Sequence, residues 1–334
     1  MLTRRKVFRL ALGIAIAALF IWLTLRQVDL ARIAQVLRDA RIDFLVAATA
    51  LLCVGYCCRI ARWRTMLARD NPALRFIDCA GPLVASAAAN SVLPFRAGDI
   101  MRAFAFNGRL SGTAGSVLAT IFVERLLDLL VIIMLLGVAL WSFHLDLARL
   151  LGFGGPLLVM ASGVILLVLL YPAVLQPVVR LLGFAAARLP AAARLQAELK
   201  RATNTLGKLA GGSTMWQLIA WSCATWIIEG GVFWLVALSL VSIAAPVGAW
   251  LALPAGTMAT AIPSTPGYVG TFHYFTAQAM ALAGNDKTAS AAYAFLVHIV
   301  LWLPPTVSGG LYLAFRPAQA ANAAGPGARQ PSRT

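Results

Sequence analysis

The stretch TAGSVLATIFVERLLDLLVIIMLLGVALWSF, residues 113–143, decides the fold class of this chain. It is a long apolar run that contains three ionisable side chains, those of Glu124, Arg125 and Asp128. At 1.5 Å per residue, a helix of this length spans the roughly 30 Å hydrocarbon core of a bilayer. The run therefore predicts a transmembrane helix, with Glu124 about 16 Å from Thr113 and so near mid-bilayer.

The composition of the whole chain is also that of a membrane protein. Of its 334 residues, 60% are hydrophobic and 12% are charged, against roughly 45–50% and about 25% in soluble proteins. The net charge of +16 could instead indicate nucleic-acid binding, but the basic residues lie between apolar runs, where the positive-inside rule accounts for them. We therefore expect membrane lipids as partners and no nucleic acid.

Further apolar runs predict an all-α polytopic membrane protein with six full spans and two broken or re-entrant segments. The full spans are expected at residues 7–25, 42–63, 113–143, 156–175, 215–241 and 289–315. The broken segments, residues 76–94 and 246–283, contain glycines and prolines, which are tolerated at membrane depth where they line a cavity. Residues 1–316 then form one membrane domain, and residues 317–334 a disordered cytoplasmic tail.

The order of these segments suggests an inverted repeat. Two spans, a broken segment and a further span occur in residues 7–143 and again in residues 156–315. Both breaks carry a Pro-x-x-x-Gly frame, from Pro94 to Gly98 and from Pro263 to Gly267. Interrupted helices at matching positions of two halves point to a transport site near the membrane midplane.

Basic residues set the expected orientation. They are dense at the N-terminus, in an arm at residues 180–208 and after the second span, where they are Arg59, Arg62, Arg64, Arg69 and Arg75. Cytoplasmic loops are enriched in such residues, so we expect both termini and the arm in the cytoplasm.

The charges of residues 113–143 need partners if they lie in the membrane. Arg125 and Asp128 are three residues apart and can pair on one helix face, whereas Glu124 and Asp128 share a face as like charges. One surplus negative charge remains, and Arg96 and Arg102 are the expected donors. The alternative is an ion cluster that only holds helices together.

Other titratable groups at membrane depth are few. Glu229 stands near the middle of the fifth span, which has no basic residue, so it is either protonated or faces a cation such as Arg125. His298 has the setting of a packed, hydrogen-bonded histidine. The five cysteines and three histidines lack metal-ligand spacing, and we expect no metal and no cofactor.

An enzymatic function has little support in the sequence. No nucleophile elbow and no glycine-rich phosphate loop is present. An intramembrane lipid hydrolase or transferase that uses Glu124, Asp128 and His273 is the alternative, but we expect the chain not to be an enzyme.

Two motifs resemble those of a known family. The first is Asn90-Ser-Val-Leu-Pro94-Phe-Arg96-Ala-Gly98-Asp99-Ile-Met-Arg102, followed by Val123-Glu124-Arg125-Leu-Leu-Asp128. The second is Ile262-Pro263-Ser-Thr265-Pro266-Gly267-Tyr-Val-Gly270-Thr271-Phe272. Together they resemble the lysylphosphatidylglycerol synthase transmembrane, flippase-like family over about residues 7–315. The chain departs from the family pattern at Asp99 and His273, where relatives often have Glu.

The resemblance implies a stand-alone membrane domain, without the aminoacyltransferase domain of two-domain relatives, in the cytoplasmic (inner) membrane of a bacterium. It implies translocation or binding of an anionic, polyprenyl or hopanoid-type lipid. A non-catalytic accessory subunit of a lipid-modifying enzyme or glycosyltransferase is the alternative. The candidate headgroup and translocation residues are Asn90, Pro94, Arg96, Gly98, Asp99, Arg102, Glu124, Arg125, Asp128, Glu229, Pro263, Thr265, Pro266, Gly267, Gly270, Thr271 and His273.

Within that set, three arginines are expected to hold a phosphate group. Arg96, Arg102 and Arg125 each offer a guanidinium fork that matches phosphate geometry. Rocking of one repeat against the other would then give alternating access.

Overall fold

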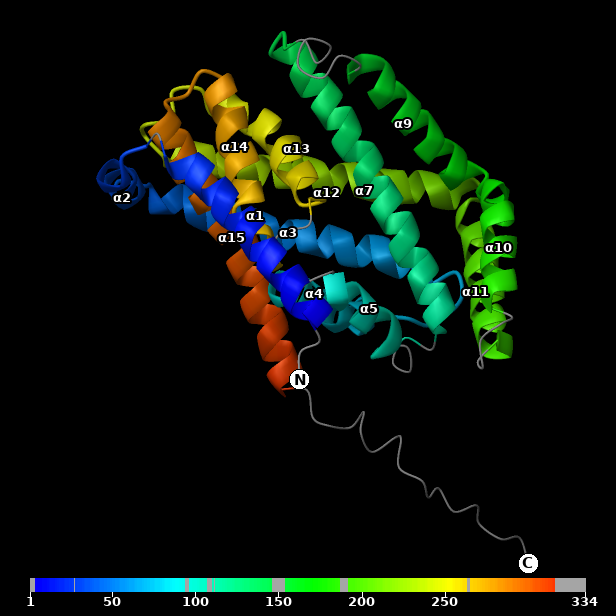
Figure 1. Cartoon of the computed structure of the whole chain (residues 1–334). Helices are drawn as coiled ribbons and strands as arrows, with labels where there is room; N and C mark the ends of the chain where they lie inside the picture. Colours follow the sequence, from blue (N-terminus) through cyan, green and yellow to red (C-terminus); the bar gives the residue numbers. More distant parts are fainter. Residues whose placement is uncertain are drawn as a thin grey trace, which may run out of the picture.

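The computed structural model describes residues 4–26, 28–93, 96–106, 110, 112–145, 154–186, 192–262 and 265–315. All regular secondary structure in these residues is helical, which confirms the predicted all-α class (Figure 1). The α-helices are α1 (Arg4–Leu25), α2 (Leu30–Arg38), α3 (Ile42–Leu67), α4 (Phe76–Val92), α5 (Ala97–Phe104), α7 (Ala114–Ser142), α9 (Gly154–Leu170), α10 (Gln176–Ala186), α11 (Ala192–Leu209), α12 (Gly212–Ser239), α13 (Ala249–Ala259), α14 (Thr271–Leu282) and α15 (Lys287–Phe315). Short 3-10 helices are η2 (Pro172–Leu175), η3 (Pro246–Gly248) and η4 (Pro266–Tyr268).

Three of the described helices, α3, α12 and α15, are long and apolar enough to cross a membrane. The number rises to five if each of two bent pairs is one span. These pairs join α1 to α2 at 82° and α9 to the following η2–α10 segment at 97°. Helix α7, which carries the ionisable cluster, is 29 residues long. The predicted runs at residues 42–63, 113–143, 215–241 and 289–315 thus each correspond to one long helix.

Helices α3 and α12 pack along each other through the middle of the molecule (Figure 1). Glycines allow their close approach. A Cβ added at Gly231 would lie 2.9 Å from Leu51, and one at Gly55 would lie 3.2 Å from Ile228. Small residues at such contacts let helix backbones approach in membrane proteins, where packing rather than water exclusion drives association. Trp226 and Phe233 of α12 continue this contact into the largest apolar core.

The two segments that were predicted to be broken are helical hairpins. In the first, α4 is continuous despite Pro82, so the interruption lies at its end, between α4 and α5. The hairpin is tight because a Cβ at Gly98 of α5 would lie 2.1 Å from the backbone oxygen of Ser86. In the second hairpin, α13 and α14 pack together, and η4 forms part of the connection between them.

The described parts of the basic arm belong to α10 and α11, and α11 contacts the body at two points. Glu198 of α11 accepts a hydrogen bond from the backbone N–H of Gly115, at 2.6 Å, in the first turn of α7. A carboxylate at a helix N-terminus accepts a hydrogen bond from a backbone N–H that has no partner within the helix. Its negative charge also interacts favourably with the helix dipole. Lys208 of α11 pairs with Asp70, just after α3, at 2.6 Å. These contacts fix the arm against the ends of α3 and α7.

Candidate functional site

A cavity of about 1300 Å³ lies between the two hairpins and the long helices. Its lining includes apolar side chains, such as those of Ile14, Leu52 and Leu83. The charged residues of the lining, here called the charged wall, are Arg59, Arg96, Asp99, Arg102, Glu124, Arg125, Asp128 and Glu229. Charged side chains at membrane depth are costly, and they mark substrate pathways or paired clusters.

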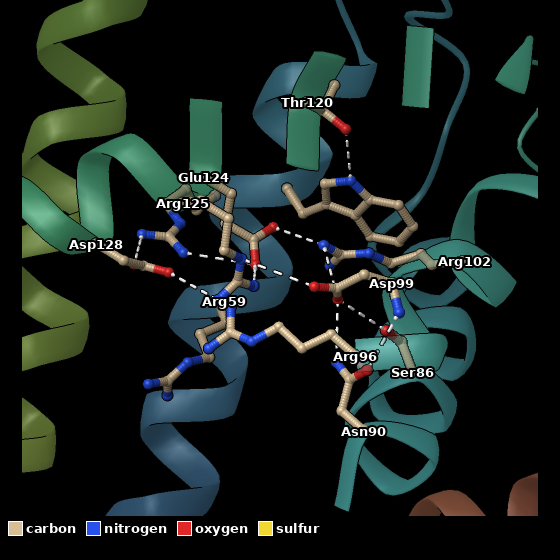
Figure 2. Close-up of polar contacts among 12 residues, drawn as sticks. Arg59, Ser86, Asn90, Arg96, Asp99, Arg102, Thr120, Glu124, Arg125 and Asp128 are labelled. Atoms are coloured by element: carbon tan, nitrogen blue, oxygen red, sulfur yellow. Dashed lines mark hydrogen bonds and ion pairs between the residues drawn. The ribbon is translucent and has the colours of Figure 1, made fainter. Parts of the chain in front are cut away.

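The centre of the charged wall is the predicted trio on α7 (Figure 2). Arg125 Nη2 lies 2.6 Å from Glu124 Oε1, and its Nη1 lies 3.4 Å from Asp128 Oδ2. The pairing of Arg125 with Asp128, three residues apart on one helix, was predicted and is confirmed. Arg125 remains partly open to the cavity, with 38% of its side chain exposed.

Two arginines of α3 supply the cations that the sequence analysis missed. Arg62 Nη1 lies 2.7 Å from Asp128 Oδ1 and donates to Ser222 Oγ at 2.9 Å. Its side chain is 1% exposed. Arg59 forms an ion pair with Glu229 of α12. Glu229 therefore faces a cation, which was one of the two predicted alternatives, but this cation is Arg59 and not Arg125. Arg59 and Arg62 both lie inside α3, which continues to Leu67.

The first hairpin contributes the other side of the network (Figure 2). Arg102 of α5 pairs with Glu124 Oε2 at 3.1 Å and stacks on the Trp63 ring, 4.7 Å from its centre. Asp99 accepts a hydrogen bond from Asn90 Nδ2 at 3.1 Å and lies 3.9 Å from Arg125 Nε. Arg102 is thus confirmed as a donor to the carboxylates of α7.

Arg96 is the exception among the expected donors. It contacts Tyr268 in the second hairpin, with its Nε 3.3 Å from the phenol oxygen. Within the described part of the chain it makes no ion pair of 4.0 Å or less. Both residues have left-handed backbone angles, with φ of 52° at Arg96 and 58° at Tyr268. Such angles are uncommon for side-chain-bearing residues and often occur at functional sites. The two hairpins therefore meet through two strained residues.

The charges of this site do not cancel. Five arginines, Arg59, Arg62, Arg96, Arg102 and Arg125, face four carboxylates, Asp99, Glu124, Asp128 and Glu229, among the described residues. Every one of the four carboxylates has an arginine partner. The excess positive charge is carried by Arg96, which lies at the exposed edge of the cavity.

The residues of the second motif divide into two groups. Thr265, Pro266 and Gly267 line the cavity, as Asn90 does in the first hairpin. Thr271 and His273 are buried in the first turn of α14, and Gly270, with φ of 95°, packs where an added Cβ would lie 2.6 Å from the backbone of Ala17. Gly98 serves the packing of α5 on α4. Pro94 and Pro263 lie outside the described residues.

A family comparison can now be set against this geometry. The model of the lysylphosphatidylglycerol synthase TM region matches residues 10–309. The chain belongs to this family. It is accordingly a multi-pass membrane protein, and the resemblance seen in its two motifs is confirmed over most of its length.

Two curated relatives extend the comparison. UPF0104 membrane protein MJ1078 of Methanocaldococcus jannaschii is 24% identical over 230 residues, which cover 66% of this chain and 91% of that protein. Glycosyltransferase AglD of Haloferax volcanii is 31% identical over 139 residues, 42% of this chain. The match spans only 22% of the length of AglD. No solved structure matches the chain.

Proposed function

We propose that this protein binds a membrane lipid with an anionic phosphate headgroup and moves it between leaflets. The observation that carries the proposal is a cavity lined by both charged and apolar side chains, to which both hairpins contribute. Its volume of about 1300 Å³ exceeds the roughly 300–1,000 Å³ of typical small-molecule sites, and a lipid headgroup with the start of its chains needs such space.

Two arginines are the proposed phosphate ligands. Arg96 makes no ion pair among the described residues, and Arg125 presents 38% of its side chain. Arg102, by contrast, is 2% exposed and engaged with Glu124 and Trp63. We therefore assign Arg102 to the network that orients Arg125, and we assign phosphate contact to Arg96 and Arg125. Their guanidinium groups can bind phosphate oxygens in pairs.

The excess positive charge of the site supports an anionic lipid over a cationic one. A cationic headgroup would add to the charge of Arg96 without displacing an existing partner from the carboxylates. An anion instead neutralises the charge of Arg96, which makes no ion pair among the described residues. Phosphate diesters and polyprenyl phosphates both meet this requirement.

The proposed mechanism is alternating access by two inverted halves, each of which contributes one hairpin. Six full spans, cytoplasmic termini and a place in the inner membrane of a bacterium complete this proposal. The hairpins support it by their matching breaks, since each break places residues of positive φ at the cavity, Arg96 in the first and Gly267 and Tyr268 in the second. The Arg96–Tyr268 contact then closes one end of the cavity, and its separation opens that end.

A second candidate is a non-catalytic accessory role in a glycosyltransferase or lipid-modifying pathway. The similarity of 139 residues to the glycosyltransferase AglD favours it. Such a subunit would bind a lipid intermediate without moving it. We propose no enzymatic function, because His273 is buried in the first turn of α14 and does not line the cavity that Glu124 and Asp128 line.

Native mass spectrometry of the purified protein tests lipid binding. We expect co-purified anionic phospholipid or polyprenyl phosphate on the wild type and at least tenfold less on Arg96→Gln, since a hydrogen bond to a charged group contributes about 1.5–3 kcal/mol. Arg41→Gln is the matched control, because Arg41 is exposed and pairs with Asp43 at the start of α3. Equal lipid occupancy in all three proteins would contradict the assignment of Arg96.

A further inference from the structure

Two histidines, the buried His273 and the half-buried His298, lie beside the turn of the second hairpin, residues 267–270. His273 of α14 accepts a hydrogen bond at Nδ1 from the backbone N–H of Gly270, at 3.1 Å. Its Nε2 lies 2.8 Å from Nδ1 of His298 on α15. The two rings therefore connect the end of the 267–270 turn at Gly270 to α15 in one chain of hydrogen bonds.

These contacts fix where the protons of the pair lie. A neutral imidazole carries one N–H and offers one acceptor nitrogen. Nδ1 of His273 faces the Gly270 donor, so the proton of His273 is on Nε2 and is donated to His298 Nδ1. The proton of His298 is then on its Nε2, because its Nδ1 accepts the hydrogen bond from His273.

This chain of hydrogen bonds has no room for a further proton. It has two links, namely Gly270 to His273 and His273 to His298. Each link takes one hydrogen, of which the Gly270 amide supplies one and the neutral His273 ring supplies the other. A further proton on either ring places two hydrogens in one link and breaks it, wherever along the chain that proton settles. Protonation and the closed turn are thus mutually exclusive.

The turn lies where its release would reach the cavity. Gly267 and Tyr268 line the cavity, and Tyr268 is the hydrogen-bond partner of Arg96. Three of the four turn residues have positive φ, namely 72° at Gly267, 58° at Tyr268 and 95° at Gly270, and the backbone is strained at Tyr268 because it is not a glycine. Strained angles persist only while surrounding contacts impose them. Loss of one link therefore favours a rearranged turn.

The surroundings of the pair are apolar. The rings of Phe272 and Phe295 contact the two imidazoles. Helices α1, α13 and α15 pack around this part of α14. Among the described residues, no ion pair or hydrogen bond joins a charged side chain to either ring. Apolar surroundings disfavour a charged imidazolium, so both rings are neutral while the turn is closed.

We propose that His273 and His298 form a proton-binding site, and that binding of one proton releases the 267–270 turn and separates Tyr268 from Arg96. The ligand of this site is the proton itself. Water supplies the proton and takes it back, so no other reactant is required. The inference concerns the turn, and it does not require that the cavity holds a lipid.

Thiol labelling of the turn tests the proposal independently of lipid movement. The reporter is Val269→Cys in the full chain with its five native cysteines replaced by alanine or serine. We expect the labelling rate to rise by about threefold to tenfold between pH 8 and pH 5 relative to the variant His273→Gln/His298→Asn, the range produced by loss of one hydrogen bond. Comparison of the two backgrounds at each pH cancels the ionisation of the thiol.

His144→Asn is the matched control, because His144 is the third histidine and lies exposed after α7. It should keep the full pH response. Nitrogen-15 NMR of labelled histidine provides a second measurement, with both His273 and His298 expected as neutral Nε2–H tautomers at pH 8. A labelling ratio that does not change with pH, or Nδ1–H tautomers at either residue, would overturn the proposal. Neither result would alter the lipid-binding measurement on Arg96.

Discussion

Arg62 of α3 and Asp128 of α7 form a buried ion pair, with Nη1 2.7 Å from Oδ1 and the arginine side chain 1% exposed. The same guanidinium lies 3.9 Å from Glu124 and donates to Ser222 of α12. Three long helices are thereby joined at one side chain. Removal of one member of a buried ion pair leaves the other charge without a partner, which is more costly than loss of the pair as a whole.

Arg62→Ala should therefore lower the stability of the purified protein by about 3–5 kcal/mol. Arg62→Ala/Asp128→Ala should recover part of that loss, because the carboxylate that lost its nearest cation is gone and only its longer contact with Arg125 is given up. Thermal unfolding in detergent is the measurement. Arg41→Ala, which removes an arginine paired with Asp43 on the surface, should change stability by less than about 1 kcal/mol. Equal melting temperatures for the wild type and the Arg62 variant would contradict burial of the pair.

Gly98 and Gly137 make a matched pair for testing the first hairpin. A Cβ at Gly98 would lie 2.1 Å from the Ser86 backbone oxygen, whereas nothing lies within 4 Å of one at Gly137 in α7. Gly98→Ala should destabilise the protein by about 1–3 kcal/mol through overpacking. Gly137→Ala should be neutral or stabilising by up to about 1 kcal/mol, because alanine favours the helix. Thermal unfolding distinguishes them, and a neutral Gly98→Ala would mean that α5 does not pack closely on α4.

Much of the fold could be predicted from apolar runs alone. The runs that became α3, α7, α12 and α15 are long, and charge and proline mark their ends. Pairing of Arg125 with Asp128 followed from helix spacing. The pairing of Arg59 and Arg62 with carboxylates was missed because both arginines were assigned to the end of a span by the positive-inside rule. A single sequence does not indicate how far α3 continues. The spacing of three between these arginines on a helix was the available signal.

Contacts between distant segments could not be predicted from the sequence, because they depend on how the helices pack. His273 and His298 were recognised as titratable groups at membrane depth, but their contact depends on how α14 packs against α15. The same holds for Arg96 and Tyr268, which are 172 residues apart. Apolar patterning defines which face of a helix is buried, but it does not define the opposing residue.

Gly267 tests whether the second hairpin acts as a gate. It has φ of 72°, and an added Cβ would lie 3.2 Å from both Ser91 and Trp302. Gly267→Val should therefore slow lipid movement and leave lipid binding largely intact. Gly284→Val is the control, because Gly284 also has positive φ, at 95°, but nothing lies within 4 Å of its added Cβ. Both variants should lose a similar amount of stability, about 1–2 kcal/mol, through strain.

The two variants are compared by native mass spectrometry for binding and by a leaflet-reporter assay for movement. Equal rates of lipid movement in Gly267→Val and Gly284→Val would argue against a gate at this turn. Loss of bound lipid in Gly267→Val alone would instead place the turn in the headgroup site.

Lipid movement by the reconstituted protein tests the central claim most directly. The assay follows dithionite reduction of nitrobenzoxadiazole-labelled phosphatidylglycerol in vesicles, with labelled phosphatidylcholine as the zwitterionic comparison. We predict that the wild type and Arg41→Gln expose the inner-leaflet anionic lipid faster than protein-free vesicles, and that Arg96→Gln loses about tenfold or more of this rate. The central claim would be contradicted if dithionite reduced the anionic lipid no faster in wild-type vesicles than in protein-free ones. A wild-type rate for Arg96→Gln would contradict it as well.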